Sequence, residues 1–381
     1  MNHSAIRFWN MEFSVMCCIN LFVMTAIFML FPYQMQLLGH FGIGNTESSL
    51  CICLFALGMF IPGPFNSFMV DAYRRKRVCQ NSLLILVLSC LAMEFFPYKA
   101  GCIALRIIQG MCFGTFQMSL GGTLVNDMTV SEFRTPADYF YTWFGLVGMP
   151  LGFALGIYLL GTCGTYVVFW SVIALLVLSC LCLFFLHVPF RAPVKASLFS
   201  LDRFFSPKSF LLILNLLPLA VLPTLFSGST TTEDSLWMMC IGVVAGFLSH
   251  RLFFIDADPR ADAVSGMILV LASIAMMLNP AGKDFMHAAY VLLGIGGSWF
   301  TSRILLYFLK LSDHCQRGTL QQTYILTLIS GNCVGFYLAH LPMNVYLLAM
   351  ILTIFSLAFF LLVTHRWFKN KKDRDFKFRE V

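Results

Sequence analysis

The chain has 381 residues, of which 59% are hydrophobic and only 11% are charged. Soluble domains carry about 25% charged residues, so the shortage of polar side chains excludes a water-soluble globular protein. The net charge of +7 suits a surface of anionic membrane lipids. No basic motif interleaved with aromatic residues accompanies this charge, which argues against nucleic acid as a partner.

Twelve apolar segments follow one another along the chain, and each is predicted to be a membrane-spanning helix. Their runs are continuously apolar, without the period of two that a membrane β-barrel requires. The first six segments cover residues 13–31, 48–70, 78–96, 101–125, 139–160 and 166–188. The other six cover residues 210–229, 236–255, 264–278, 286–309, 320–340 and 345–363. We therefore expect an all-α membrane protein.

A polar stretch that contains three prolines separates the first six segments from the last six. Its position is the one expected of a loop between two domains. The predicted domains are an N-terminal bundle at 1–188, a cytoplasmic loop at 189–208, a C-terminal bundle at 209–364 and a basic cytoplasmic tail at 365–381.

The fifth and eleventh segments resemble each other when the sequence is shifted by 183 residues. Gly148 then meets Gly331, and Gly152 meets Gly335. Glycines that recur in register mark places where two helices approach closely. The repeat predicts two pseudo-symmetric bundles of six helices each.

Lysine and arginine are distributed unevenly among the connections between the segments. If the N-terminus lies inside the cell, nearly all 25 basic residues fall in inside connections, and only Lys99 and Lys283 fall in outside loops. Basic residues are retained on the cytoplasmic side of a membrane. We expect a multi-pass protein of the cell (inner) membrane with both termini in the cytoplasm.

The connection between the second and third segments places Asp71 just before a run of basic residues that includes Arg75 and Lys76. This stretch resembles the loop signature of the major facilitator superfamily. Asp71, Arg75 and Lys76 match that signature, whereas Ser67 and Arg74 replace its two glycines.

The resemblance implies that Asp71, Arg75 and Lys76 form a latch that holds the two halves together when the transport site opens outward. Asp127, at the inner end of the fourth segment, is the candidate partner of this latch. The alternative is an ordinary basic loop with one solvated aspartate.

The fourth segment contains Arg106, followed by Gln109 and Gly110, which is similar to the Arg-x-x-Gln-Gly motif of the same family. An arginine inside a membrane span is costly and is a functional candidate for that reason. Glu94 lies at a similar depth, so we expect Glu94 and Arg106 to pair and to form a protonatable switch. A static pair that joins two helices is the alternative.

The fifth segment contains Gly148, Pro150 and Gly152, a Gly-x-Pro-x-Gly core that resembles the fifth-helix motif of antiporters in this family. Glycines allow close packing, and the proline frees a backbone carbonyl. The resemblance favours export over uptake. It implies the major facilitator fold of about twelve helices.

Polar side chains inside the segments are the candidates for a substrate path between the halves. They are Asn20, Gln109, Gln117, Asn215 and Asn332. Hydrogen bonds between helices are the alternative role for each of them. Arg303, near the inner end of the tenth segment, is expected to extend to the membrane surface.

Taken together, the sequence predicts a secondary active transporter that exports a small organic molecule in exchange for protons and works as a monomer. Uptake driven by protons, or a member that senses without transporting, are the alternatives. We expect neither an enzyme nor a cofactor or metal site, since no catalytic constellation and no nucleotide-binding loop is found in the sequence.

Overall fold

The computed structural model describes residues 9–96, 98–188, 197–229, 233–253, 258–279, 282–312 and 316–369. This part of the chain is built from helices and contains no strand. The predicted all-α fold is confirmed. Much of the predicted 189–208 loop and of the basic tail lies outside the described residues.

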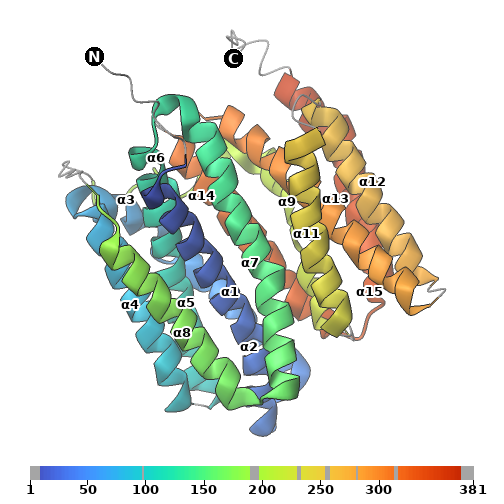
Figure 1. Cartoon of the computed structure of the whole chain (residues 1–381), viewed down its shortest axis with the longest axis horizontal. Helices are drawn as coiled ribbons and strands as arrows, with labels where there is room; N and C mark the ends of the chain where they lie inside the picture. Colours follow the sequence, from blue (N-terminus) through green and yellow to red (C-terminus); the bar gives the residue numbers. More distant parts are fainter. Residues whose placement is uncertain are drawn as a thin grey trace.

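The helices of the first half run up and down the molecule (Figure 1). Its elements are α1 (Met11–His40), α2 (Asn45–Phe60), α3 (Gly63–Ala72), α4 (Arg75–Leu91), η1 (Ala92–Glu94), α5 (Lys99–Ser119), η2 (Leu120–Leu124), α6 (Val125–Met128), η3 (Ser131–Phe133), α7 (Arg134–Thr162) and α8 (Thr165–Phe185).

The second half repeats this course. Its elements are η4 (Pro207–Ser209), α9 (Phe210–Ala220), α10 (Leu222–Gly228), α11 (Glu233–Phe253), α12 (Pro259–Leu278), α13 (Lys283–Lys310), α14 (Arg317–Ala339), α15 (Val345–Phe359) and η5 (Phe360–Thr364).

Each half packs mainly against itself. In the first half α1 lies against α7 and α8, and α5 lies against α2 and α4. In the second half α13 lies against α11 and α12, and α14 lies against α9 and α10. The halves meet where α7 contacts α11 and where α14 contacts α2 and η2. Figure 1 shows both termini at one end of the molecule, which we call the terminal end, in contrast to the opposite end.

Nine of the described helices are long and apolar enough to cross a membrane, or ten if the pair α2 and α3, which is bent by 50°, forms one span. Two further helices, α5 with 21 residues and α14 with 23, are long enough to cross a membrane but are too polar to be counted among these candidate spans. Most of their side chains are buried inside the protein. Helices that other helices shield from lipid need no apolar outer face. The count of twelve spans stays a prediction.

The glycines of the predicted repeat occupy equivalent places in the two halves. A Cβ at Gly148 on α7 would lie 2.8 Å from the Leu21 carbonyl oxygen of α1. A Cβ at Gly331 on α14 would lie 3.2 Å from the Leu217 oxygen of α9. α7 therefore packs on α1 as α14 packs on α9, which supports the pseudo-symmetric architecture.

Candidate functional site

A charge network closes the terminal end of the first half. Arg75, the first residue of α4, donates from Nη2 to Asp71 Oδ1 at 3.3 Å, and its Nη1 is paired with Asp127 of α6. All three side chains are mostly shielded from solvent. The structure thus brings together three of the four residues that were predicted to form the latch.

Lys76 takes a different role. Its ammonium group donates to the carbonyl oxygens of Phe184 at 2.9 Å and Leu186 at 2.6 Å. These carbonyls lie at the C-terminal end of α8, where helix oxygens lack partners within the helix and where a positive charge is favourable. Lys76 therefore ties α4 to α8 and stands outside the Asp71–Arg75–Asp127 network.

The turn that carries the network needs no glycine. Tyr73 has φ −112° and ψ 169°, and Arg74 has φ −68° and ψ 116°. Both residues adopt extended conformations that any residue with a Cβ can take. This explains how Arg74 can replace the second glycine of the family signature while Asp71 and Arg75 still meet.

Arg203, from the segment between the halves, joins the network from outside. Its Nε lies 3.1 Å from Asp71 Oδ2, and its backbone N–H donates to Thr319 Oγ1 of α14 at 2.8 Å. It is the one non-glycine residue of the described chain with a positive φ, 63°. Such a backbone is strained. Arg203 therefore connects both halves at the cost of local strain.

A second ion pair crosses directly between the halves at the terminal end. Arg317, at the start of α14, donates from Nε to Asp138 Oδ2 of α7 at 2.6 Å and from Nη2 to Thr135 Oγ1 at 2.5 Å. The Asp138 side chain is fully buried. The Gln321 amide, oriented so that its nitrogen faces acceptors, donates to Asp138 Oδ1 at 3.1 Å.

Sequence reasoning missed Asp138. It lies one residue before the predicted fifth segment at 139–160, outside the apolar run in which polar side chains were considered. The usable signal was the repeat, which aligns Arg134 with Arg317 and so marks the region where α7 and α14 begin.

A third cluster lies at the terminal end of the second half. Asp262 of α12 accepts from Arg303 Nε of α13 at 2.7 Å, and its Oδ2 lies 3.2 Å from His250 Nε2 of α11. The other ring nitrogen of His250 lies 3.2 Å from the Tyr139 hydroxyl of α7, in the first half. The prediction for Arg303 was wrong. Its side chain is 4% exposed because Asp262 offers a buried partner, so it does not extend to the membrane surface.

The halves also touch toward the opposite end. Thr46 of α2 donates to the His340 carbonyl at 3.1 Å, and the Cys53 thiol lies 2.6 Å from the Cys333 carbonyl oxygen of α14. The Phe31 ring of α1 meets the Phe336 ring of α14 edge to face at 5.0 Å. In this structure the halves are in contact at both ends.

Arg106 and Glu94 are not paired in this structure. The Tyr33 hydroxyl donates to Glu94 Oε1 at 2.9 Å. Arg106 Nη1 donates to Gln109 Oε1 at 3.1 Å, and its guanidinium lies between the rings of Phe31 and Phe55 at 5.0 and 5.2 Å. Glu94 ends a short 3-10 turn after α4, so a similar distance from the connecting turn did not give a similar position.

Two groups of the predicted path residues make hydrogen bonds within one half. Asn20 donates to the Tyr141 carbonyl, Gln117 donates to Asn20 Oδ1, and the Tyr141 hydroxyl donates to Gln117 Oε1, each at 2.8 Å. Asn215 donates to the Ser356 carbonyl at 2.8 Å. These amides join helices, which is the alternative role that the sequence left open.

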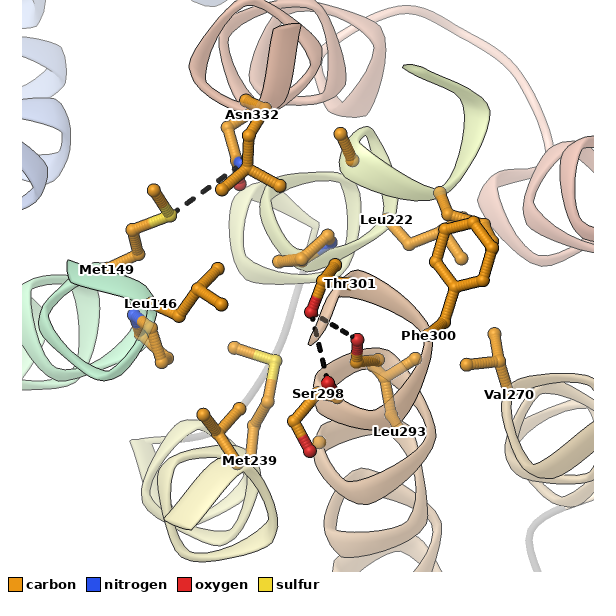
Figure 2. Close-up of a pocket in the computed structure, with 18 of the residues that line it drawn as sticks. Leu146, Met149, Leu222, Met239, Val270, Leu293, Ser298, Phe300, Thr301 and Asn332 are labelled. Carbon is orange, nitrogen blue, oxygen red and sulfur yellow. Dashed lines mark hydrogen bonds between the residues drawn. The ribbon is translucent and has the colours of Figure 1, made fainter. Parts of the chain in front are cut away.

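Asn332 is the predicted path residue that lines a cavity. This cavity lies between α7 of the first half and α9 to α14 of the second (Figure 2). Its volume is about 70 Å³, which holds a few water molecules but not a drug-sized ligand. Figure 2 shows Met149 facing Asn332, with Ser298 and Thr301 below. None of the described residues that line it is charged.

Comparison with known proteins relates this arrangement to others. The family model described as the Major Facilitator Superfamily matches residues 14–365. No curated protein matches the chain. The structure is similar to that of the human organic anion transporter TETRAN, with a TM-score of 0.70 and 13% identity over 93% of this chain and 99% of that one.

Two further solved structures share the architecture. A bacterial homologue of the iron transporter ferroportin, in an outward-facing state, has a TM-score of 0.68 and 14% identity over 94% of this chain and 100% of that one. An auto-inhibited peptide transporter of the POT family has a TM-score of 0.68 and 10% identity over 98% of both chains. At these identities the similarity concerns the fold.

Proposed function

The chain belongs to the major facilitator superfamily and is a membrane transporter, and we propose that it moves a small organic molecule by alternating access in exchange for protons. The observation that carries this proposal is the cavity between the two halves, enclosed by elements of both. A cavity shared by two bundles becomes open to either side when one bundle rocks against the other.

The contacts at the two ends supply the gates of this cycle. At the terminal end the gate consists of ion pairs and hydrogen bonds, with Asp138 and Arg317 directly across the interface. Toward the opposite end it consists of the Phe31–Phe336 contact and the bonds from Thr46 and Cys53. A solute or an ion shifts the balance between the two gates only if it binds the two states with different affinities.

We assign the proton-sensitive step to Asp138. Burial disfavours its charged form, whereas the pair with Arg317 favours it, so the balance depends on whether the terminal end is closed. A proton on Asp138 would remove the charge that holds Arg317. This assignment replaces the predicted Glu94–Arg106 switch, whose members are apart in the structure.

Export is the proposed direction, with the terminal end in the cytoplasm and the chain acting as a monomer in the cell membrane. The support is the distribution of Lys and Arg and the Gly148–Pro150–Gly152 core, which packs α7 on α1. Proton-driven uptake uses the same gates but carries the proton and the solute together in one direction, whereas exchange carries them alternately in opposite directions.

Transport by purified protein in lipid vesicles tests the proposal. A panel of labelled organic compounds is offered with and without a pH gradient. We expect movement of at least one compound that rises with the gradient and falls at least tenfold in Asp138→Asn. Movement without any pH dependence would refute proton exchange, and the sign of the dependence separates export from uptake.

A further inference from the structure

The guanidinium of Arg106 is buried without a charged partner among the described residues. The side chain is 1% exposed, and its Nη1 donates to Gln109 Oε1 at 3.1 Å. The other two nitrogens, Nε and Nη2, have no hydrogen-bond partner in the described chain. A buried charge that lacks an ion pair costs several kcal/mol. The rings of Phe31 and Phe55 offset only part of this cost.

The two free nitrogens are the pair that matters for recognition. Nε and Nη2 lie on the same edge of the planar guanidinium, and their N–H groups point in parallel. That edge binds the two oxygens of a carboxylate at once, with a geometry that a single amide oxygen does not reproduce. Gln109 already occupies Nη1, so it fixes the guanidinium and leaves this edge available.

Phe31, Phe153 and Phe336 form a layer of aromatic rings that connects Arg106 with the helix that carries Asn332. Phe31, which lies against the guanidinium, packs on Phe153 of α7 at 5.4 Å and on Phe336 of α14 at 5.0 Å. Asn332 lies one helical turn before Phe336, on the same face of α14, and lines the cavity. The layer is made by helices of both halves, so a rocking motion of the halves would separate its rings.

We propose that Arg106 and the cavity, widened when the halves rock apart and the aromatic layer separates, receive the two ends of one amphipathic solute: Arg106 binds its carboxylate through Nε and Nη2, and the uncharged cavity receives its apolar body. The cavity lining supports the second part. It is apolar apart from Trp143, Ser298, Thr301 and Asn332, and such a wall favours hydrocarbon over a second charge. This inference rests on the proposed transport function, for which it names the substrate class.

A water molecule between Arg106 and the Gln34 amide is the competing explanation. Gln34 Oε1 is also buried without a partner, and its amide nitrogen, like that of Gln109, faces the Met93 sulfur. A site made for water would satisfy the same atoms. It would show no preference for an anion, and the experiment separates the two cases on that ground.

Binding to purified protein in detergent is measured by thermal shift with matched pairs of compounds. The pairs are 1-naphthylacetate with 1-naphthylacetamide, and 4-phenylbutyrate with 4-phenylbutyramide, which differ only in the charged end. We expect at least one acid to bind at least tenfold more tightly than its amide. Arg106→Gln should abolish this preference, and Arg106→Lys should weaken it because lysine lacks the planar fork.

Two further variants complete the test. Lys99→Gln removes an exposed cation near the start of α5 and should leave the preference unchanged. Gly297→Val places a side chain into open space at the cavity wall, so it should weaken acid and amide alike while their ratio stays constant. This variant tests the contribution of the cavity to binding even if the Arg106 variants do not fold.

Several results would overturn the inference. They are equal binding of acid and amide in both pairs, no binding of any of the four compounds, or a preference for acids that survives Arg106→Gln. Failure of the proposed function looks different. An acid that binds through Arg106 but is never moved into vesicles refutes transport, whereas pH-driven movement of a neutral compound in Arg106→Gln refutes only the inference.

Discussion

At the scale of single residues, buried charges are either paired across helices or left without a charged partner. Asp138 and Asp262 each have an arginine partner from another helix. Arg106 has only an amide and two aromatic rings. Pairing makes the first two suitable for gates that open and close, and the lack of an anion makes Arg106 suitable for a ligand.

The pair of Asp138 and Arg317 should show strong energetic coupling. Arg317→Gln leaves a fully buried carboxylate without its cation, so we expect the free energy of unfolding to fall by about 3 kcal/mol. Asp138→Asn combined with Arg317→Gln removes both charges and should recover most of that loss. Thermal melts of the purified variants measure these changes in stability. A double variant whose loss equals the sum of the two single losses would contradict the assignment of a coupled pair.

The strained backbone of Arg203 gives a second prediction. Arg203→Gly loses a partly exposed ion pair, worth less than about 1 kcal/mol, but relieves the positive φ of 63°. Arg203→Val loses the same pair and keeps a β-branched side chain in a left-handed conformation, at an added cost of about 1–2 kcal/mol. The valine variant should therefore melt below the glycine variant. Equal melting would show that the strain carries no free energy.

At the scale of the elements, close packing at glycines determines how the helices of each half assemble. The long α7 lies on α1 through Gly148 and Gly152, and α14 lies on α9 and α10 through Gly331 and Gly335. Pro150 stands within α7, near the glycines. These helices also carry the residues that face the other half, so their close packing fixes where Asp138 and Asn332 meet the interface.

Adding one methyl group at these glycines should disturb the protein. Gly148→Ala places a Cβ 2.8 Å from the Leu21 oxygen and 2.9 Å from the Met24 Cβ, and we expect a loss of about 1–3 kcal/mol in stability. Gly39→Ala, at the end of α1, is the matched control, because nothing lies within 4 Å of its added Cβ. The melting temperatures of the two variants give the answer. A drop in the control as large as that in Gly148→Ala would remove the packing argument.

At the scale of the whole molecule, two halves with the same internal packing line one cavity, but they contribute different residues to its wall. The second half supplies most of the lining residues, from α9 to α14, and α7 supplies the contribution of the first half. The first half contributes Arg106 behind its aromatic layer. The asymmetry gives each half a separate part in binding one solute.

The orientation in the membrane gives a prediction for the whole molecule. Cys163, exposed in the turn between α7 and α8, lies at the opposite end from Tyr73, which is exposed between α3 and α4. A thiol reagent that cannot cross membranes should label Cys163 in intact cells. The double variant Tyr73→Cys with Cys163→Ser should be labelled more strongly than the Cys163→Ser variant alone only after the cells are permeabilised. Labelling of both sites in intact cells would contradict a cytoplasmic terminal end.

The sequence alone determined the solvent of this protein, the order of its helices and the relation between its halves. These features depend on composition, on the length of apolar runs and on glycines spaced 183 residues apart, all of which are local or repeated patterns. The contact of Asp71 with Arg75 was also predictable, because only three residues lie between them along the chain.

Only the tertiary structure decided which distant charges meet. Arg317 and Asp138 are 179 residues apart, and Arg303 finds Asp262 rather than the membrane surface. Glu94 accepts a hydrogen bond from Tyr33 instead of pairing with Arg106, which donates to the uncharged Gln109. The tilt and rotation of each helix set these outcomes, and both depend on packing against all neighbouring helices at once, which no pattern within a single segment records.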